Sequence, residues 1–561
     1  MIEILFFLIF FILSLLSTIG YGLFFHKVCF YNLKVKIENE TIYFGFFGLF
    51  LITLISLITS LFFSHNFIHN LFLHFFGLLF LVILKFDEKN EYLKYIIFIS
   101  IFVFLALLIS KGHDDLSYYH LPFTKYLTEN KIIFGLGHLN HGYNLLSSLF
   151  FLNSTYYFPI TEYYSYHYTS IFFLIFFNYF LIKEIFFNKN HEITKYIYIF
   201  AFSFFNLSFN RIAEYGTDKT GQLLIVVLIV KLFQIVCFNK NKINELLFLI
   251  PLLAYCITLK TYFLPYILLS LTIFFINRNY FANLKFLIFS SSFIFFLSIL
   301  IIYFFHHFIS TGCFISPLSF TCLGESTSWG REINHIKGLS IWLEQWAKAA
   351  AGPNFRVENM MEYIKNFNWI SNWIDKYFLE KFIDQLLILL VSYIVIFIFI
   401  KDFNFRKTKF IINKEALFFY LILCIIFFIW LTNHPALRYG GYSIVFLIVS
   451  FPVALIFYFF SNKKIYEKKI KYFVLLIIIL FNVKNFSRIN NEMNREDIYK
   501  FVNFPFFKII EKNYKENKFD AGLSIYSAHH CWSTPTPCGQ VDNTINVQKK
   551  YGYFFIIKLK N

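Results

Sequence analysis

Charged residues are scarce in this sequence. Only 15% of its 561 residues are charged, and the mean hydropathy is +0.60. A chain with so few charges does not form the several soluble domains that its length would otherwise suggest. Apolar runs recur from end to end, and about 20 helical residues are enough to cross the hydrocarbon core of a bilayer. The composition therefore predicts an all-α polytopic membrane protein.

Several functional motifs are also missing. The sequence has no P-loop, no GxSxG, no HExxH and no Rossmann glycine pattern. Their absence argues against a cytosolic nucleotide substrate. The first apolar segment has no basic n-region and no small-residue cleavage site, so we expect it to remain as a span. The net charge of +17 is attributed to lysines and arginines that flank membrane helices, not to nucleic acid binding.

The apolar segments predict a bundle of about fourteen transmembrane helices. Lysine-rich connectors occur at alternate positions, and short loops of that kind belong in the cytoplasm. The N-terminus and the remaining loops are then outside. The expected spans are 2–24, 42–63, 68–85, 94–110, 162–184, 194–212, 219–238, 243–259, 261–277, 284–308, 382–400, 414–432, 441–460 and 472–487.

This topology divides the chain into six regions, three of helices and three outside. The large outside loop contains two tryptophan-rich segments, IWLEQWAKAA and NWISNWIDKYF, which are typical of amphipathic helices at a membrane surface. The regions are 1–110 (N-terminal helices), 111–161 (first outside loop), 162–308 (central helices), 309–381 (large outside loop), 382–487 (C-terminal helices) and 488–561 (outside tail).

Two close pairs of cysteines fall in outside segments. Cys313 and Cys322 enclose CFISPLSFTC, and Cys531 and Cys538 enclose CWSTPTPC. Disulfides form and persist outside the cytoplasm, so both pairs are predicted to be oxidised. The alternatives are free thiols, or one metal site made by all four.

The first outside loop begins with KGHDDLSYYHLP, residues 111–122. Asp114 or Asp115 could cap the helix that follows, but a cap needs only one carboxylate. Repulsion between adjacent carboxylates raises the pKa of one, which suits a general base, and the two could instead share a divalent cation such as Mg²⁺ or Mn²⁺. Asp115 and Asp114 are therefore the catalytic candidates, and the substrate-binding candidates beside them are His113, Tyr119 and His120.

Five other outside segments contain polar candidates. GLGHLNHGYN offers either a metal site or sugar-binding side chains, and RIAEYGTDKTG offers two carboxylates that could instead pair with Arg211 and Lys219. Arginine suits a phosphate because its planar guanidinium binds two oxygens. A lone lysine at a helix end, such as Lys260, often only extends its ammonium group into solvent. The candidates are His138, His141, Asn144, Glu214, Asp218, Lys260, Arg331 and Arg438.

These candidates all lie at one membrane face. No predicted span contains a chain of buried ionisable residues, although transporters usually place such residues along their pathway. The distribution favours an enzyme that acts on a lipid-linked substrate.

The first loop resembles that of a known enzyme class. Asp115-Leu-Ser-Tyr-Tyr-His-Leu-Pro and the later Gly135-Leu-Gly-His-Leu-Asn-His-Gly-Tyr-Asn144 are similar to the bacterial GT-C membrane glycosyltransferases, in the group akin to protein mannosyltransferases (family 39). Within that group they resemble a subset of uncharacterised bacterial membrane proteins. Gly216-Thr-Asp218 resembles the second acidic position of the group.

The resemblance implies a GT-C-like helix bundle in the bacterial inner membrane, with interfacial helices in its periplasmic loops. It implies an inverting transfer of a sugar from a polyprenyl-phosphate donor to a glycan, lipid or protein acceptor of the cell envelope, on the periplasmic face. Asp115 would be the general base, with Asp114 as the fallback, and the leaving phosphate would be held by a cation among Lys260, Arg331 and Arg438. No cofactor is required with certainty.

Three alternatives remain open. An envelope polysaccharide polymerase or ligase would use arginines and histidines of the large loop, such as Arg331 and His335. A transporter of lipid-linked glycans would need essential polar residues inside the spans. A non-enzymatic envelope protein would retain the architecture without the chemistry.

Overall fold

The computed structural model is mostly helical. It describes residues 2–30, 40–86, 88–109, 112–113, 115–188, 190–238, 242–277, 281–350, 357–400, 414–460, 467–494, 509 and 513–559. Ten helices within these ranges are long and apolar enough to cross a membrane, so the chain is a multi-pass membrane protein. Each of these ten candidate spans overlaps one of the following α-helices: α1 (Ile2–Phe30), α2 (Phe44–Thr59), α4 (Lys89–Leu107), α7 (Tyr168–Phe186), α9 (Asp218–Phe238), α13 (Ser291–Thr311), α17 (Ile383–Ile400), α18 (Lys414–Asn433), α19 (Gly441–Phe460) and α20 (Glu467–Met493).

Each of the fourteen predicted spans coincides with a helical segment, but four of them are not among these ten. A helix of 17 residues is about 26 Å long, which is shorter than the hydrocarbon core of about 30 Å. The count of about fourteen spans therefore stays a prediction. The four segments are α3 (Phe67–Ile83), α8 (Glu192–Ser208), α10 (Lys242–Leu259) and η6 (Thr261–Leu268) continued by α11 (Leu269–Asn277).

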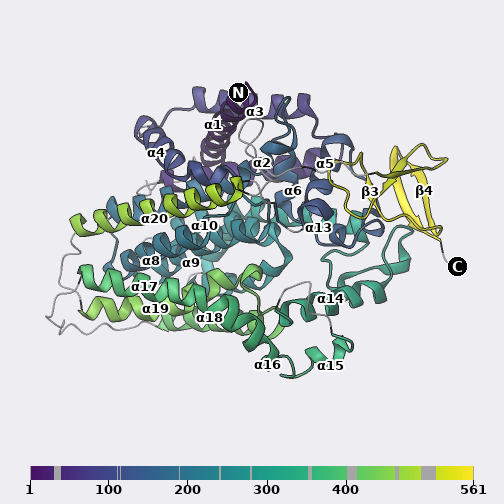
Figure 1. Ribbon diagram of the computed structural model, residues 1–561. Coiled ribbons are helices and arrows are strands. Elements are labelled where there is room, and N and C mark those ends of the chain that lie inside the picture. The colour runs from purple at the N-terminus through teal and green to yellow at the C-terminus, as the bar shows by residue number, and fades with distance from the viewer. Residues whose placement is uncertain are drawn as a thin grey trace.

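The helices pack around a centre formed by α2, α7 and α9, which are almost wholly buried. Around them, α8 packs against α17, α19 and α20, and these four helices lie side by side in Figure 1. Small residues allow close approach of α1 and α3, because a Cβ on Gly20 would lie 1.8 Å from the carbonyl oxygen of Gly77.

The predicted outside loops fold into short helices. The first contains a π-helical turn, η2 (Leu116–His120), which leads into α5 (Leu121–Glu129), followed by η3 (Leu136–His138), η4 (His141–Asn144) and α6 (Ser148–Ser154). The tryptophan-rich segments become α14 (Ile333–Lys348), and α16 (Ile370–Trp373) continued by η9 (Ile374–Phe382). Their position on a membrane surface stays a prediction.

The C-terminal segment departs from the all-α expectation. Strands β1 (Lys515–Lys518), β2 (Ser524–Ser527) and β3 (Cys538–Gly539) form one small sheet, and β4 (Ile545–Lys550) and β5 (Tyr553–Lys558) form an antiparallel hairpin. Sheets this small are marginal alone and need a partner surface. They find it in the first loop: the backbone of Phe134 bonds the carbonyl of Phe554 and the N–H of Ile556, and Figure 1 shows the strands beside α5.

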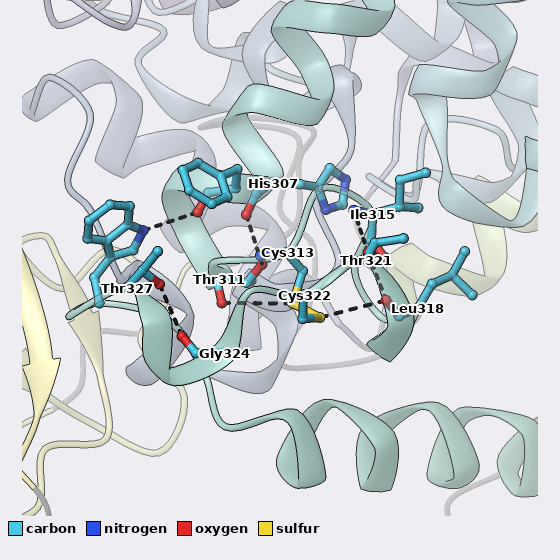
Figure 2. Close-up of a disulfide and its surroundings, with 11 residues drawn as sticks. His307, Thr311, Cys313, Ile315, Leu318, Thr321, Cys322, Gly324 and Thr327 are labelled. Carbon is cyan, nitrogen blue, oxygen red and sulfur yellow. Dashed lines mark hydrogen bonds between the residues drawn. A yellow bond between two sulfur atoms is a disulfide. The ribbon is translucent and has the colours of Figure 1, made fainter.

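Both predicted disulfides are present. Cys313 bonds Cys322, with sulfurs 2.08 Å apart, and Cys531 bonds Cys538, with sulfurs 2.10 Å apart. Figure 2 shows the first of these directly after the last turn of α13, where the backbone N–H of Cys313 donates to the hydroxyl of Thr311 at 3.1 Å. The alternatives of free thiols or a four-cysteine metal site are wrong.

Buried ionisable groups do occur within the predicted spans, as one ion pair between α7 and α9. Glu184 in α7 and Lys231 in α9 form an ion pair at 2.6 Å, with side chains 0% and 8% exposed. Asn190 donates to the same carboxylate. Lys231 is 13 residues from the start of α9, or about 20 Å along its axis. Hydropathy averages conceal such pairs, because a single charge changes a window mean very little.

Candidate functional site

Asp115 stands at the start of η2, where the chain re-enters helix after α4. Its carbonyl accepts the backbone N–H groups of Tyr119 and His120 at 3.2 and 3.3 Å, which makes it the first residue of the π-helical turn. Its carboxylate makes no capping hydrogen bond. The capping interpretation is therefore wrong for Asp115. Asp114 lies outside the described residues.

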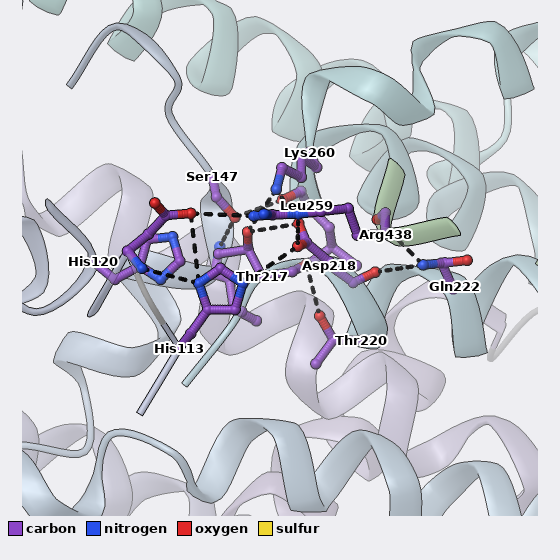
Figure 3. A network of polar contacts seen from close by, with 12 residues as sticks. His113, His120, Ser147, Thr217, Asp218, Thr220, Gln222, Leu259, Lys260 and Arg438 are labelled. Carbon is purple, nitrogen blue, oxygen red and sulfur yellow. Dashed lines mark hydrogen bonds and ion pairs between the residues drawn. The ribbon is translucent and has the colours of Figure 1, made fainter. Parts of the chain in front are cut away.

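The carboxylate of Asp115 instead faces Arg438. The guanidinium of Arg438 places Nη2 3.1 Å from Oδ2 of Asp115 and Nε 2.9 Å from Oδ2 of Asp218. Lys260 bonds the other oxygen of Asp218 and also donates to the hydroxyl of Thr217 at 3.1 Å. Figure 3 shows Lys260 and Arg438 converging on Asp218. One arginine fork thus joins two carboxylates, and the lysine holds the second of them.

The four charged groups come from four distant parts of the chain. Asp218 is the first residue of α9, Lys260 separates α10 from η6, and Arg438 lies in η10 (Leu437–Tyr439), between α18 and α19. Gln222, one turn along α9, fixes this arrangement. Its amide donates to the carbonyls of Leu437 and Arg438, and its carbonyl accepts the backbone N–H of Ser443. The turn that carries Arg438 is thereby tied to the helix that carries Asp218.

Two histidines stand beside the acids. His113 lies 3.5 Å from Asp115 and 3.9 Å from Asp218, and the Nδ1 atom of His120 lies 3.0 Å from the carbonyl oxygen of Tyr215. Burial lowers the pKa of His113 to about 3, with Arg438 adding to the effect, and burial lowers the pKa of His120 to about 4. Both rings are therefore neutral near pH 7.

The pKa of Asp115 departs from the expectation of a raised value. Burial acts to raise the pKa, but His120, Arg438, His113 and Lys260 act to lower it, and the net pKa lies below its usual value. Since His113 and His120 are neutral near pH 7, Arg438 and Lys260 are the charges that keep Asp115 ionised there. The carboxylate is thus ready to accept a proton, although its bond to Arg438 weakens it as a base.

Asp115, Lys260 and Arg438 line one cavity of about 440 Å³. Tyr119 and His141 also line it, so five of the predicted candidates meet here. Asp218 is 7% exposed and lies behind Arg438, whereas Asp115 is 33% exposed and can meet a ligand. Helical segments η6, α14 and α18 contribute a mostly apolar part of the lining, in which Glu344 and Asn433 are polar exceptions; its apolar residues are Leu264, Pro265, Leu343, Trp346, Ile426, Ile429 and Trp430.

A smaller cavity of about 190 Å³ adjoins Asp218 and Arg438. Glu214 lies there, with its carboxylate 2.8 Å from Arg211, while Lys219 donates to the carbonyl of Arg211 at 3.1 Å. The alternative that the two carboxylates pair with Arg211 and Lys219 is therefore confirmed only for Glu214, which pairs with Arg211, whereas Asp218 pairs with Arg438 and Lys260.

Three predicted residues lie away from the main cavity. Arg331 bonds His138 at 3.0 Å and also bonds His335, while the other ring nitrogen of His138 lies 3.1 Å from the carbonyl oxygen of Trp329. Asn144 is fully buried and donates to the carbonyls of its own loop. Asn144 therefore stabilises a turn, and Arg331 and His138 form a separate cluster.

The sequence reasoning missed several cavity residues. Thr217 directly precedes Asp218, so the Gly-Thr-Asp motif could have identified Thr217 as a cavity residue. Tyr118 is next to the chosen Tyr119, and the π-helical turn brings both tyrosines to the lining of the cavity. Tyr262 and Trp430 carry no local signal, because aromatic residues make up 23% of the chain.

Among the residues that the structure describes, no three or more His, Cys, Asp and Glu side chains are arranged to hold a metal ion. Asp115 and Asp218 share the guanidinium of Arg438, and Asp114, the other carboxylate of the predicted cation pair, lies outside the described residues.

One family model matches the chain. It is described as a domain of unknown function (DUF8201) and covers residues 4–445, which include every charged group of the cavity. No curated protein and no solved structure matches the chain.

Proposed function

Because the chain belongs to the DUF8201 family, whose function is unknown, we propose an activity from the geometry of the site. The protein is a membrane glycosyltransferase. It moves a sugar from a polyprenyl-phosphate donor to an acceptor of the cell envelope, with inversion at the sugar carbon. It resides in the bacterial inner membrane, and its cavity opens on the periplasmic face.

One observation carries this proposal: Asp115, Lys260 and Arg438 line a single cavity that also has a mostly apolar wall. An inverting transfer needs a base for the acceptor hydroxyl and positive charge for the leaving phosphate. Asp115 supplies the base, and the two cations receive the phosphate. A lipid phosphate also needs an apolar surface beside its charged group, which the wall of η6, α14 and α18 supplies.

The reaction follows from these positions. The acceptor oxygen forms a bond to the anomeric carbon while the bond from that carbon to the phosphate oxygen breaks. Asp115 takes the hydroxyl proton, and the polyprenyl phosphate leaves as an anion stabilised by Lys260 and Arg438. When the donor phosphate binds Arg438, that arginine loosens its contact with Asp115, and the carboxylate becomes a stronger base where one is needed.

The apolar wall suits a lipid chain. On helix α18, which contributes to this wall, the side chains of Leu417, Leu421 and Phe428 are each more than half exposed on the outside of the bundle. In a membrane protein such side chains face lipid. A chain that enters beside α18 can thus pass from the bilayer to the cavity without crossing water.

The test uses full-length protein in nanodiscs, undecaprenyl-phosphate hexoses as donors and a panel of envelope glycans as acceptors. Asp115→Asn should lower transfer by about 10²-fold to 10⁴-fold, the range for loss of a general base, and still bind undecaprenyl phosphate. Glu162→Gln, which changes an exposed carboxylate directly after the same loop, is the matched control. Transfer by Asp115→Asn at the wild-type rate would refute the assignment.

The orientation has its own test. The proposed topology places the C-terminal strands in the periplasm, so a C-terminal alkaline phosphatase fusion should be active and a C-terminal fluorescent protein fusion dark. The reverse pattern would place the cavity on the cytoplasmic face.

A polysaccharide polymerase or ligase is the second candidate, because Arg331, His138 and His335 form a compact cluster of the large loop and first loop. That function predicts that Arg331→Gln abolishes activity while Asp115→Asn retains it. For a glycosyltransferase we expect the reverse: Asp115→Asn abolishes activity and Arg331→Gln retains it, because Arg331 does not line the cavity that contains Asp115.

A further inference from the structure

A group of aromatic rings stands at the mouth of the main cavity. We call it the ring wall: Tyr118, His141, Trp342, His529 and His530. Tyr118 and His141 are joined by a hydrogen bond of 3.1 Å, and the ring of His141 lies 5.5 Å from that of Trp342. Tyr118, His141 and Trp342 line the cavity that contains Asp115.

The C-terminal unit completes this wall. His529 and His530 precede the disulfide residue Cys531, and their rings lie 6.2 and 5.8 Å from the ring of Tyr118. His530 also contacts the hydroxyl of Ser117 at 3.0 Å.

The adjoining disulfide loop is fixed to the same turn. The backbone N–H of Trp532 donates to the carbonyl of Ser117 at 3.0 Å, and the hydroxyl of Tyr143 donates to the carbonyl of Cys538 at 2.8 Å. The two histidines are therefore placed by the first loop and not by their own sheet alone.

The chemistry of the ring wall differs from that of the adjoining apolar wall, whose Trp346 ring lies 5.6 Å from that of Trp342. Its side chains carry hydroxyl, imidazole and indole groups, and it contains neither a carboxylate nor a lysine or arginine. Flat rings cover the apolar faces of a ligand, while their polar edges bond its hydroxyl groups. Such a surface fits an uncharged, hydroxyl-rich molecule better than it fits a lipid phosphate or a charged peptide.

We infer that the ring wall is a glycan-binding subsite, built jointly by the first loop, α14 and the C-terminal unit. Tyr118 and Asp115 belong to the same turn of the chain, so a glycan on the wall presents a hydroxyl towards Asp115. Its role as the subsite for the acceptor rests on the proposed sugar transfer. The binding of a glycan there does not depend on that reaction. The cavity thus has two parts, one for the lipid-linked donor and one for a sugar acceptor.

Binding without donor tests the inference. Full-length protein in nanodiscs is titrated with four neutral oligosaccharides (chitotetraose, maltotetraose, cellotetraose and mannotetraose) and, separately, with undecaprenyl phosphate. At least one oligosaccharide should bind in the millimolar range or better. The double variant His529→Ala/His530→Ala and the single variant Trp342→Ala should weaken that binding by about tenfold, because each removes ring contacts and hydrogen bonds.

The controls separate this subsite from the donor site and from misfolding. Tyr551→Ala removes another exposed ring of the C-terminal unit, 96% exposed, and should bind the oligosaccharide as wild type does. The histidine double variant should bind undecaprenyl phosphate normally and keep the Cys531–Cys538 disulfide. Lys260→Ala should show the opposite pattern, with weaker binding of the lipid phosphate alone.

Two results would overturn the inference: no binding of any of the four oligosaccharides, or equal binding by wild type and both ring-wall variants. Failure of the transferase is a different result. If Asp115→Asn remains active while oligosaccharide binding depends on Trp342 and the two histidines, the glycan subsite stands and the proposed chemistry falls.

Discussion

Arg438 and Asp115 are 323 positions apart in the chain, yet a guanidinium nitrogen of one lies 3.1 Å from a carboxylate oxygen of the other. The same guanidinium also holds Asp218. Arg438 therefore has two roles. It neutralises the charge of the buried Asp218, and it influences the pKa of the more accessible Asp115. These roles can be separated by mutation.

The two acids should respond differently to loss of charge. Asp218 is almost fully buried between Arg438 and Lys260, so Asp218→Asn leaves the largely buried Lys260 without its carboxylate partner, while Arg438 keeps only Asp115. We expect a loss of about 3–5 kcal/mol in the free energy of unfolding. Asp115→Asn should cost at most about 1 kcal/mol, because Asp115 is partly exposed and its pair is screened by solvent. Thermal unfolding in detergent measures both, and equal losses would contradict the division of roles.

Replacement of Arg438 should move the pH dependence of transfer. In the wild type, the cations keep the pKa of Asp115 below its usual value, so activity that needs the ionised carboxylate should persist down to the ordinary carboxylate range and decline only below it. Arg438→Gln removes a positive charge and should shift the acid limb of kcat/KM to higher pH, whereas Arg438→Lys should shift it less. An unchanged acid limb in Arg438→Gln would show that Asp115 is not the titrating group.

The neutral histidines should make the fold sensitive to acid. His120 has a folded-state pKa of about 4 against an ordinary value of 6.5, so the unfolded state binds the proton first as the pH falls. Stability should be constant above about pH 6.5 and decline from there to about pH 4, by up to about 3 kcal/mol for this residue. In His120→Gln the decline should be smaller, with His113 accounting for part of what remains. Unfolding midpoints across this pH range measure the effect.

The cysteines should divide into two classes on chemical labelling. Four of the eight are paired, so a denatured but unreduced sample should react with a maleimide at Cys29, Cys237, Cys256 and Cys424. Reduction should add the other four. Reduction should also destabilise the C-terminal unit, by about 2–3 kcal/mol for the short loop closed by Cys531 and Cys538. Labelling of more than four cysteines before reduction would contradict the pairing.

The sequence by itself determined the membrane class, the positions of the helical segments and both cysteine pairs. Each of these depends on local pattern: apolar runs fix where a helix must satisfy its own backbone in lipid, and short spacings with turn residues bring two cysteines together. It also pointed to Asp115, Lys260 and Arg438, because charges are rare in such a chain and stand out.

Only the tertiary structure decided how these residues are related. It showed that Arg438 joins Asp115 to Asp218, that Glu214 and Arg331 belong elsewhere, and that His529 and His530 reach the turn of Asp115. It also reversed the expected direction of the pKa of Asp115. The reason is physical: a charge acts on others over a few ångströms, and distances that short between remote parts of a chain are set by helix packing, which no local pattern records.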